Sequence, residues 1–337
     1  MHFKTRFFEV SFPESLVRLS NVPSATKYLS IAYVVFTITL FYVRKSCQWQ
    51  LPADGNSGSN FKLIASPILQ LIPAETLRNP WSLVLSNLVD TELWKFLANL
   101  TNLVIGGSFI ERNWNSSTEI LRFVLVIGSL TNLAVVLVTI VSSALFPGVR
   151  LDLPLDGNYT IIVGFPVVYK QLMPETTIFK ITNVPLLSKN FRFKLLPIFV
   201  LVVLTTVQLI WFHHFSQLLS IWITFMSCWV YLRFYQILPS SIAGDHGRDI
   251  IGDASDTFQL IYFFPGLLRP ILRPFFNICY NIWCNNLRMR KPFELEDIDV
   301  GNTLAEQRGA KKVSNNAEER RRQLALQLLG ERFQEGP

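Results

Sequence analysis

The chain has 337 residues, half of them hydrophobic, and only 16% of them carry charge, against about 25% in a typical soluble domain. Its mean hydropathy is +0.32, and its formal net charge of +7 is spread along the sequence. These values exclude an ordinary soluble enzyme and a nucleic-acid-binding domain, so we expect an all-α polytopic membrane protein.

The first residues, MHFKTRFFEVSFPESLVRLS, are interrupted by charge and lack a small-residue cleavage site after an apolar core. We therefore expect residues 1–27 to form an uncleaved N-terminal tail, followed by a first span at about 28–43. A polar loop comes next at 53–60. The segment after it contains three prolines and predicts an interfacial hairpin with Trp81 at headgroup depth.

A transmembrane helix needs about 20 mostly apolar residues. Five further segments approach this length, which predicts a six-helix membrane domain over residues 28–236. Asn99 and Asn132 lie within the second and third of these segments and should face other helices, because a polar amide facing lipid is costly. The five segments are 92–110, 120–146, 157–173, 194–212 and 215–235.

Basic residues predict the orientation of the spans. They are frequent in the N-terminal tail and between the fourth and fifth spans, and the fifth-to-sixth connection has none. The positive-inside rule then places both termini in the cytoplasm, although four basic residues after the first span argue mildly against it.

Residues 237–337 are expected to form a cytoplasmic tail. Its apolar segment 258–291 contains Arg269 and Arg273, which favours a membrane-surface segment; a seventh span or a re-entrant loop is the alternative. Residues 316–334 predict an amphipathic helix that docks a partner, lies on the membrane or folds onto the tail. Its candidate partner-binding residues are Arg320, Arg321, Arg322, Leu324, Leu328 and Phe333.

Catalytic chemistry has little support in the sequence. An atypical intramembrane hydrolase would have to use Thr160 as nucleophile with His213 or His214 as base, and the histidines are better explained as interfacial residues of a short hairpin. The four cysteines lack metal-site spacing, and packing or acylation explains the pair Cys279 and Cys284. We expect no catalytic, cofactor-binding or metal-binding residue.

A carrier of small molecules or ions is the alternative function. It would need polar residues at mid-membrane, and Asn99 and Asn132 could line a path. The spans contain essentially no carboxylates apart from Glu92 and Glu119 at their ends. In the stretch DGNYTIIVGF, we expect Gly157 and Gly164 to let the fourth span pack tightly against the second and sixth.

Several motifs resemble known families. The second span ends WKFLANLTNLVIGGSFIERNW and follows a tryptophan-containing hairpin, which is similar to the rhomboid-like superfamily. Rhomboid proteases begin their fourth helix with Gly-x-Ser-Gly; here the stretch is GNYT, and Tyr159 stands at the serine position. The stretches WVYLRFYQ, GDASDTFQLIYFFPGLLRPI, DIDVG and AEERRRQLALQLLGERF resemble, in this order, the Golgi family called transmembrane protein 115.

This resemblance covers about residues 25–335 and implies a rhomboid-like pseudoprotease of the Golgi membrane, multi-pass and cycling through the ER. It implies a role in Golgi-to-ER retrograde, vesicle-mediated protein transport and, indirectly, in glycosylation. The implied partners are membrane lipids and, through the tail, a Golgi tethering complex or coat components; homo-oligomerisation stays open. The family-motif residues are Trp81, Gly107, Glu111, Trp114, Gly157, Gly164, Trp229, Arg233 and Tyr235.

Overall fold

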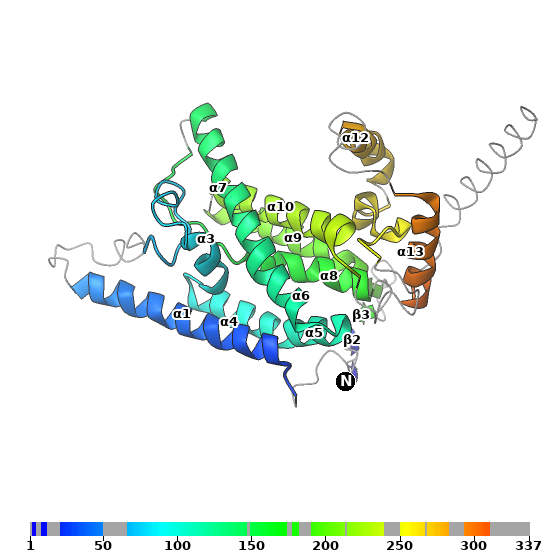
Figure 1. Ribbon diagram of the computed structural model, residues 1–337, viewed down its shortest axis with the longest axis horizontal. Coiled ribbons are helices and arrows are strands. Elements are labelled where there is room, and N and C mark those ends of the chain that lie inside the picture. Colours follow the sequence, from blue (N-terminus) through cyan, green and yellow to red (C-terminus); the bar gives the residue numbers. More distant parts are fainter. Residues whose placement is uncertain are drawn as a thin grey trace, which may run out of the picture.

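The computed structural model describes most of the chain. The described residues are 2–4, 8–11, 21–49, 66–146, 149–173, 177–181, 190–212, 214–238, 250–266, 268–282 and 293–310. Within them the protein is mostly helical, which confirms a polytopic helical membrane protein (Figure 1). The predicted partner-binding residues of the 316–334 helix lie outside the described residues, as does His213.

In the part of the chain that the structure describes, five helices are long and apolar enough to cross a membrane, and each matches a predicted span. Residues 151–158, before the fourth span, are irregular with a single bridge at Leu155, and the span itself is the shorter apolar helix Thr160–Leu172. The span-forming elements are α1 (Ser24–Trp49), α4–η2–α5 (Leu93–Trp114), α6–η3–α7 (Ser117–Leu145), η4–α8 (Thr160–Leu172), η5–α9–η6 (Phe193–Phe212) and α10–η7 (Phe215–Tyr235).

The fourth span lies in the middle of the bundle. All eight residues of α8 (Phe165–Leu172) are buried, and α8 with η4 (Thr160–Gly164) contacts α9, α10, α4 and α5. Because protein rather than lipid surrounds this helix, its ends can be satisfied by polar groups of neighbouring segments. This is why a helix of 13 residues suffices where a lipid-facing span needs about 20.

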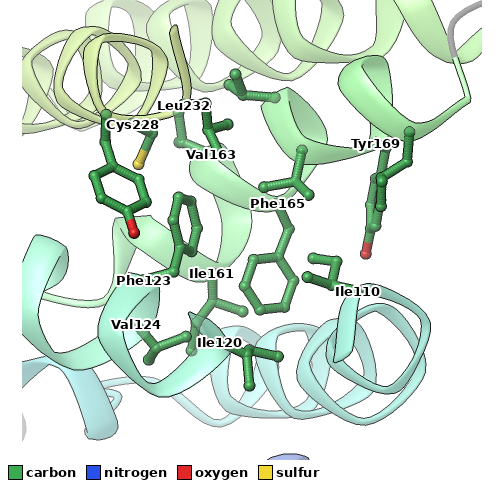
Figure 2. Close-up of a cluster of buried hydrophobic side chains, with 14 of the residues drawn as sticks. Ile110, Ile120, Phe123, Val124, Ile161, Val163, Phe165, Tyr169, Cys228 and Leu232 are labelled. Carbon is green, nitrogen blue, oxygen red and sulfur yellow. The ribbon is translucent and has the colours of Figure 1, made fainter. Parts of the chain in front are cut away.

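Aromatic and aliphatic side chains from several spans meet around α8 (Figure 2). Phe123 is the central ring: its centroid lies 6.3 Å from that of Phe165, 5.8 Å from Trp114 and 6.0 Å from Tyr231. These rings come from four different spans, so one cluster ties them together.

Among the described residues, five of the spans contain a π-helical turn, and two of these turns contain glycine. At Gly106, a Cβ would lie 1.7 Å from the hydroxyl of Tyr169, which itself donates a hydrogen bond of 3.0 Å to Asn102 Oδ1. A larger residue at this position would therefore displace the Tyr169 side chain from its hydrogen bond.

The segment predicted as an interfacial hairpin packs partly into the bundle. It contains α3 (Ser82–Leu85) and η1 (Ser86–Leu88), and Leu71 is fully buried in a β-bridge with Leu155. Trp81 directly precedes α3 and is 69% exposed. An exposed tryptophan on an otherwise anchored segment fits the predicted headgroup position, which stays a prediction.

A small sheet was not predicted. Four antiparallel strands lie in the order β1-β2-β3-β4 and join the N-terminal residues to the connection between α8 and α9. β1 pairs with β2, and β2 pairs with β3 about 170 residues later in the chain, a contact that sequence patterns do not reveal. The strands are β1 (His2–Lys4), β2 (Phe8–Ser11), β3 (Thr177–Ile181) and β4 (Asn190–Arg192).

The segment after the sixth span folds back against the membrane domain. It forms η8 (Asp256–Phe258), η9 (Leu260–Phe263), α12 (Arg269–Asn281) and α13 (Leu295–Gln307). Phe258 and Phe263 are buried, so this part of the predicted surface segment is packed in protein, whereas α12 has no buried residue. In Figure 1, α12 and α13 lie at the end of the bundle where α10–η7 finishes, here called the tail end.

Candidate functional site

Two buried carboxylates form a polar cluster at the end of the bundle opposite the tail end. Asp90 precedes α4 and is fully buried, and Asp156 precedes η4 and is 8% exposed. Neither carboxylate was predicted as a site residue from the sequence, because both lie just outside the apolar segments. Their signal was an acidic residue directly before an apolar run, in VDTELWK and in LDGNYT.

Asp90 is surrounded by hydrogen-bond donors from three segments. Asn158 Nδ2 donates to its carboxylate at 2.6 Å, Asn99 Nδ2 donates at 3.2 Å, and the hydroxyl of Tyr33 donates to Oδ2. Burial raises the pKa of Asp90 above its usual value, and the hydrogen bonds oppose that rise only in part. The Asn99 side chain therefore faces a carboxylate inside the protein and not the lipid, where an unpaired amide would be costly.

Asp156 forms the second half of the cluster. Lys95 Nζ lies 2.6 Å from its Oδ2, and Thr91 Oγ1 donates to its Oδ1 at 3.2 Å. Arg44, near the end of the described side chains of α1, donates to the Thr91 carbonyl at 3.1 Å. This ion pair joins the start of the second span to the start of the fourth. Replacing either residue by a neutral one would leave the charge of the other without its partner.

Tyr159, at the position of a rhomboid serine, is buried and bonded to an amide. Its hydroxyl donates to Gln217 Oε1 at 3.1 Å, and the same oxygen accepts the Asp156 amide at 3.4 Å. Gln217 is on the first turn of α10, whereas His214 precedes that helix and is exposed. The phenol thus donates to a neutral acceptor with the Asp156 carboxylate close by, and the exposed imidazole is no part of this hydrogen-bonded group.

Thr160, which an intramembrane hydrolase would have to use as its nucleophile, is buried on η4 beside Tyr159. Asn158 begins Asn-Tyr-Thr, which has the pattern of an N-glycosylation acceptor. Its side chain is 2% exposed, and its amide donates a hydrogen bond to Asp90 inside the protein. Within the described residues, no group of three or more His, Cys, Asp or Glu side chains is placed to hold a metal ion.

The two glycines of the fourth span are sites of close approach. A Cβ at Gly157 would lie 2.3 Å from Ser86 Oγ and 3.0 Å from Asn132 Nδ2, and one at Gly164 would lie 2.8 Å from Cys228 Sγ. Gly164 also faces Phe123. The close partners are therefore the third span, the hairpin and the sixth span; the second span, expected from the sequence, is not among the nearest atoms.

Asn132 is hydrogen-bonded to the hairpin. Its Nδ2 lies within hydrogen-bond distance of three acceptors on the hairpin, at 3.1 to 3.2 Å. Those acceptors are the Leu83 carbonyl, Ser86 Oγ and Asn87 Oδ1.

At the tail end, Glu111 holds the beginning of the first span. Its carboxylate is 4% exposed and accepts the backbone N–H groups of Ala25 and Thr26 at 3.1 and 2.8 Å. It also accepts the hydroxyls of Thr26 and Ser117 at 2.7 and 2.6 Å. These N–H groups belong to the first turn of α1, where a helix has unpaired donors and favours negative charge.

The neighbouring motif residues complete this contact. A Cβ at Gly107 would lie 3.2 Å from Thr26 Cγ2, so the missing side chain lets α1 pack closely against the second span at this point. Trp114 is 1% exposed and packs edge-on against Phe123. Gly107, Glu111 and Trp114 thus lie on one helical segment and join the first span to the aromatic cluster.

The WVYLRFYQ and GDASD motifs bind each other. Arg233 Nη1 donates to the carbonyls of Asp253 and Ser255, both at 2.5 Å, and Trp229 Nε1 donates to the Phe258 carbonyl at 3.1 Å. Tyr235 is half exposed. The sixth span therefore ends by holding the segment that follows it.

The DIDVG motif forms the next layer. On α13, a Cβ at Gly301 would lie 2.8 Å from the Ser255 amide, and Asn302 exchanges hydrogen bonds with Asp256 at 2.8 and 3.0 Å. Arg308 lies 3.3 Å from Asp253. Burial opposes ionisation of Asp253, but Arg308 and the Ser255 hydrogen bonds outweigh it and lower the pKa of that carboxyl.

Comparisons with known proteins agree with the motifs. A family model described as "Eukaryotic integral membrane protein (DUF1751)" matches residues 27–335. The chain is 52% identical to "Transmembrane protein 115 homolog" of Saccharomyces cerevisiae, over 99% of both chains. It is 31% identical to "Rhomboid-like protein 19" of Arabidopsis thaliana, over 79% of this chain and 81% of the relative. It is 26% identical to human "Transmembrane protein 115", over 75% and 67%. No solved structure matches it.

Proposed function

Because the chain belongs to the eukaryotic integral membrane protein family DUF1751, together with the transmembrane protein 115 and rhomboid-like relatives, we propose that it is a non-catalytic Golgi membrane protein. It supports vesicle-mediated Golgi-to-ER retrograde transport, and through it Golgi glycosylation, by binding membrane clients and cytoplasmic trafficking factors. Both termini face the cytoplasm.

The observation that carries the non-catalytic part is the state of Tyr159. Its hydroxyl is buried and donates to Gln217 Oε1 at 3.1 Å, in the position where a rhomboid protease needs an activated serine. A nucleophile needs a base that accepts its proton, and an amide oxygen has negligible basicity. The cluster around Asp90 and Asp156 instead joins the ends of three spans.

The transport part is supported by the motifs that follow the sixth span. WVYLRFYQ, GDASD and DIDVG are used in one folded unit, from Arg233 through Asp253 to Arg308. Residues 311–337, which contain the candidate partner-binding residues, follow this unit in the sequence. A recruitment segment attached to a firmly docked base is suited to hold a soluble factor at a membrane.

The experiment deletes residues 315–337 and measures the return of a recycling Golgi marker to the ER, in cells that lack the natural protein. Replacement of Leu324, Leu328 and Phe333 by serine tests the predicted apolar stripe, and a deletion of only the last four residues is the control. We expect slowed return with the first two changes and a normal rate with the control. Normal transport after the long deletion would refute recruitment through the tail.

A second measurement separates this function from hydrolysis. The purified full chain is treated with an activity-based hydrolase probe, alongside Thr160→Ala and Tyr159→Phe variants. We expect no labelling above that of a heat-denatured sample. Specific labelling that is lost in either variant would establish an enzyme and overturn the proposal.

The carrier alternative has one specific observation in its favour, the buried Asp90 beside Asn99 and Asn158. A solute path through this cluster would require liposome flux that falls in Asp90→Asn and Asn99→Leu. Flux that is absent in the wild-type protein, with correct folding shown by its melting temperature, would exclude the carrier.

A further inference from the structure

Helix α12 (Arg269–Asn281) carries an apolar stripe that nothing in the described part of the chain covers. Its residues follow the spacing of one helical face, at intervals of three, four, three and four. They are between 42% and 71% exposed, and no residue of α12 is buried. The stripe, extended by one residue at each end of the helix, consists of Leu268, Ile271, Phe275, Ile278 and Ile282.

The opposite face of α12 is mixed. With 3.6 residues per turn, Arg273 and Asn277 lie opposite the stripe and are exposed, together with the half-exposed Tyr280, whose hydroxyl suits an interface. Phe276, on the same side, packs against Phe264 with ring centroids 5.7 Å apart. The helix sequence RPILRPFFNICYN contains two arginines and no acidic residue. A helix with this division of residues suits an interface with acyl chains on one side and anionic headgroups on the other.

The residues before α12 fix its level relative to the bundle. The Phe263 ring lies 5.6 Å from Phe225 of α10, and Lys170 Nζ of α8 lies 3.2 Å from the centre of the same Phe263 ring. Phe225 precedes Tyr235, the end of this candidate span, by ten residues or roughly 15 Å of helix. Phe263 is therefore well inside the level at which the span ends.

Arg269 follows Phe263 by only six positions, which allows at most about 20 Å of fully extended chain. The connection is not fully extended, because the Leu268 amide donates to the Pro265 carbonyl at 3.0 Å. The beginning of α12 is thus no more than about 5 Å beyond the end of the span along its axis. This is within a headgroup layer of roughly 5–8 Å per leaflet.

We propose that α12 lies in the headgroup layer of the leaflet at the tail end, with its apolar stripe among the acyl chains and Arg273 facing anionic phospholipid headgroups. The absence of acidic residues favours a lipid surface over a second copy of α12, because two such helices would repel each other. The proposal is independent of the transport function and of which compartment the tail end faces.

The test places an environment-sensitive fluorophore on the full chain in nanodiscs, in a background without the native cysteines. The label is attached to Cys introduced as Phe275→Cys on the stripe or as Asn277→Cys on the opposite face, and doxyl-labelled lipid serves as quencher. We expect at least about three-fold stronger quenching at position 275 than at 277. Phosphatidylserine should increase quenching at 275, and Arg273→Gln should reduce that increase.

Equal quenching at the two positions would overturn the proposal. So would a label at 275 that is shielded from both water and lipid quencher, because a protein would then cover the stripe; cross-linking between 275 labels would identify a second copy. An unchanged melting temperature in detergent shows for each variant that the anchoring contact of Phe263 with Phe225 is kept.

Discussion

Glu111 provides the sharpest test of how the membrane domain is assembled. Its carboxylate accepts four hydrogen bonds, two from backbone N–H groups at the start of α1 and two from the hydroxyls of Thr26 and Ser117. Replacing Glu111 by alanine leaves both N–H groups buried without an acceptor. Glutamine keeps one acceptor oxygen and presents an NH₂ group where the carboxylate accepted Thr26.

The expected loss of stability follows from these contacts. An unpaired buried donor costs about 1–3 kcal/mol, so two backbone donors alone give roughly 2–6 kcal/mol for Glu111→Ala. Glu111→Gln should cost roughly half as much, because part of the set is kept. Glu75, paired with the exposed Arg78 at 3.9 Å, is a matched control whose replacement by glutamine should cost less than about 1 kcal/mol.

Equilibrium unfolding of the purified chain in mixed micelles of mild and denaturing detergent measures these free energies. Limited proteolysis should also show that residues before α1 become more accessible in Glu111→Ala. If Glu111→Ala loses less than about 1 kcal/mol, or no more than the Glu75→Gln control, then the carboxylate does not hold the first span and the reasoning fails.

Three further predictions concern other contacts. Gly164→Leu should cost about 3 kcal/mol or more through overpacking and Tyr159→Phe about 1 kcal/mol, so equal melting temperatures in detergent would contradict the packing role. Ionised Asp253 stabilises the fold because its pKa is lowered. That stability, present above about pH 4, should be lost as pH falls further, and an equally steep loss in Asp253→Asn would argue against it. The pKa of Asp90 is raised, so its contribution to the stability of the fold is greatest below about pH 4 and is lost as pH rises through the folded pKa. Asp90→Asn should therefore flatten the dependence of melting temperature on pH over that range. An unchanged dependence would count against this role of Asp90.

The spans could be predicted from the sequence because hydropathy is a local signal. The predicted sixth span, 215–235, coincides with Phe215–Tyr235, and the second and third differ from the structure by a few residues at their ends. The first helix is longer than predicted, starting at Ser24, because Glu111 stabilises a first turn whose own sequence is polar. A contact made 86 residues away cannot be seen in a hydropathy window.

The polar cluster could not be predicted for the same reason. Lys95 and Asp156 are 61 positions apart, and Asn158 and Asp90 are 68 apart. Each looks like a polar residue near the end of an apolar segment, which ordinarily faces water. Only the short central fourth span brings these ends together inside the protein. The small sheet also depends on pairing between distant segments, so its strands carry no strong pattern of their own.

The burial of Phe263 against Phe225 and Lys170 changes where this protein can be divided. Hydropathy suggests a cut after residue 236, between a membrane part and a tail. A chain cut there would lose the ring that covers Lys170 Nζ and the two carbonyl acceptors of Arg233 Nη1. The contacts between the sixth span and the following segment continue to about residue 310. A tail fragment and a membrane-domain fragment separated after residue 236 would therefore each lose packing partners that lie in the other.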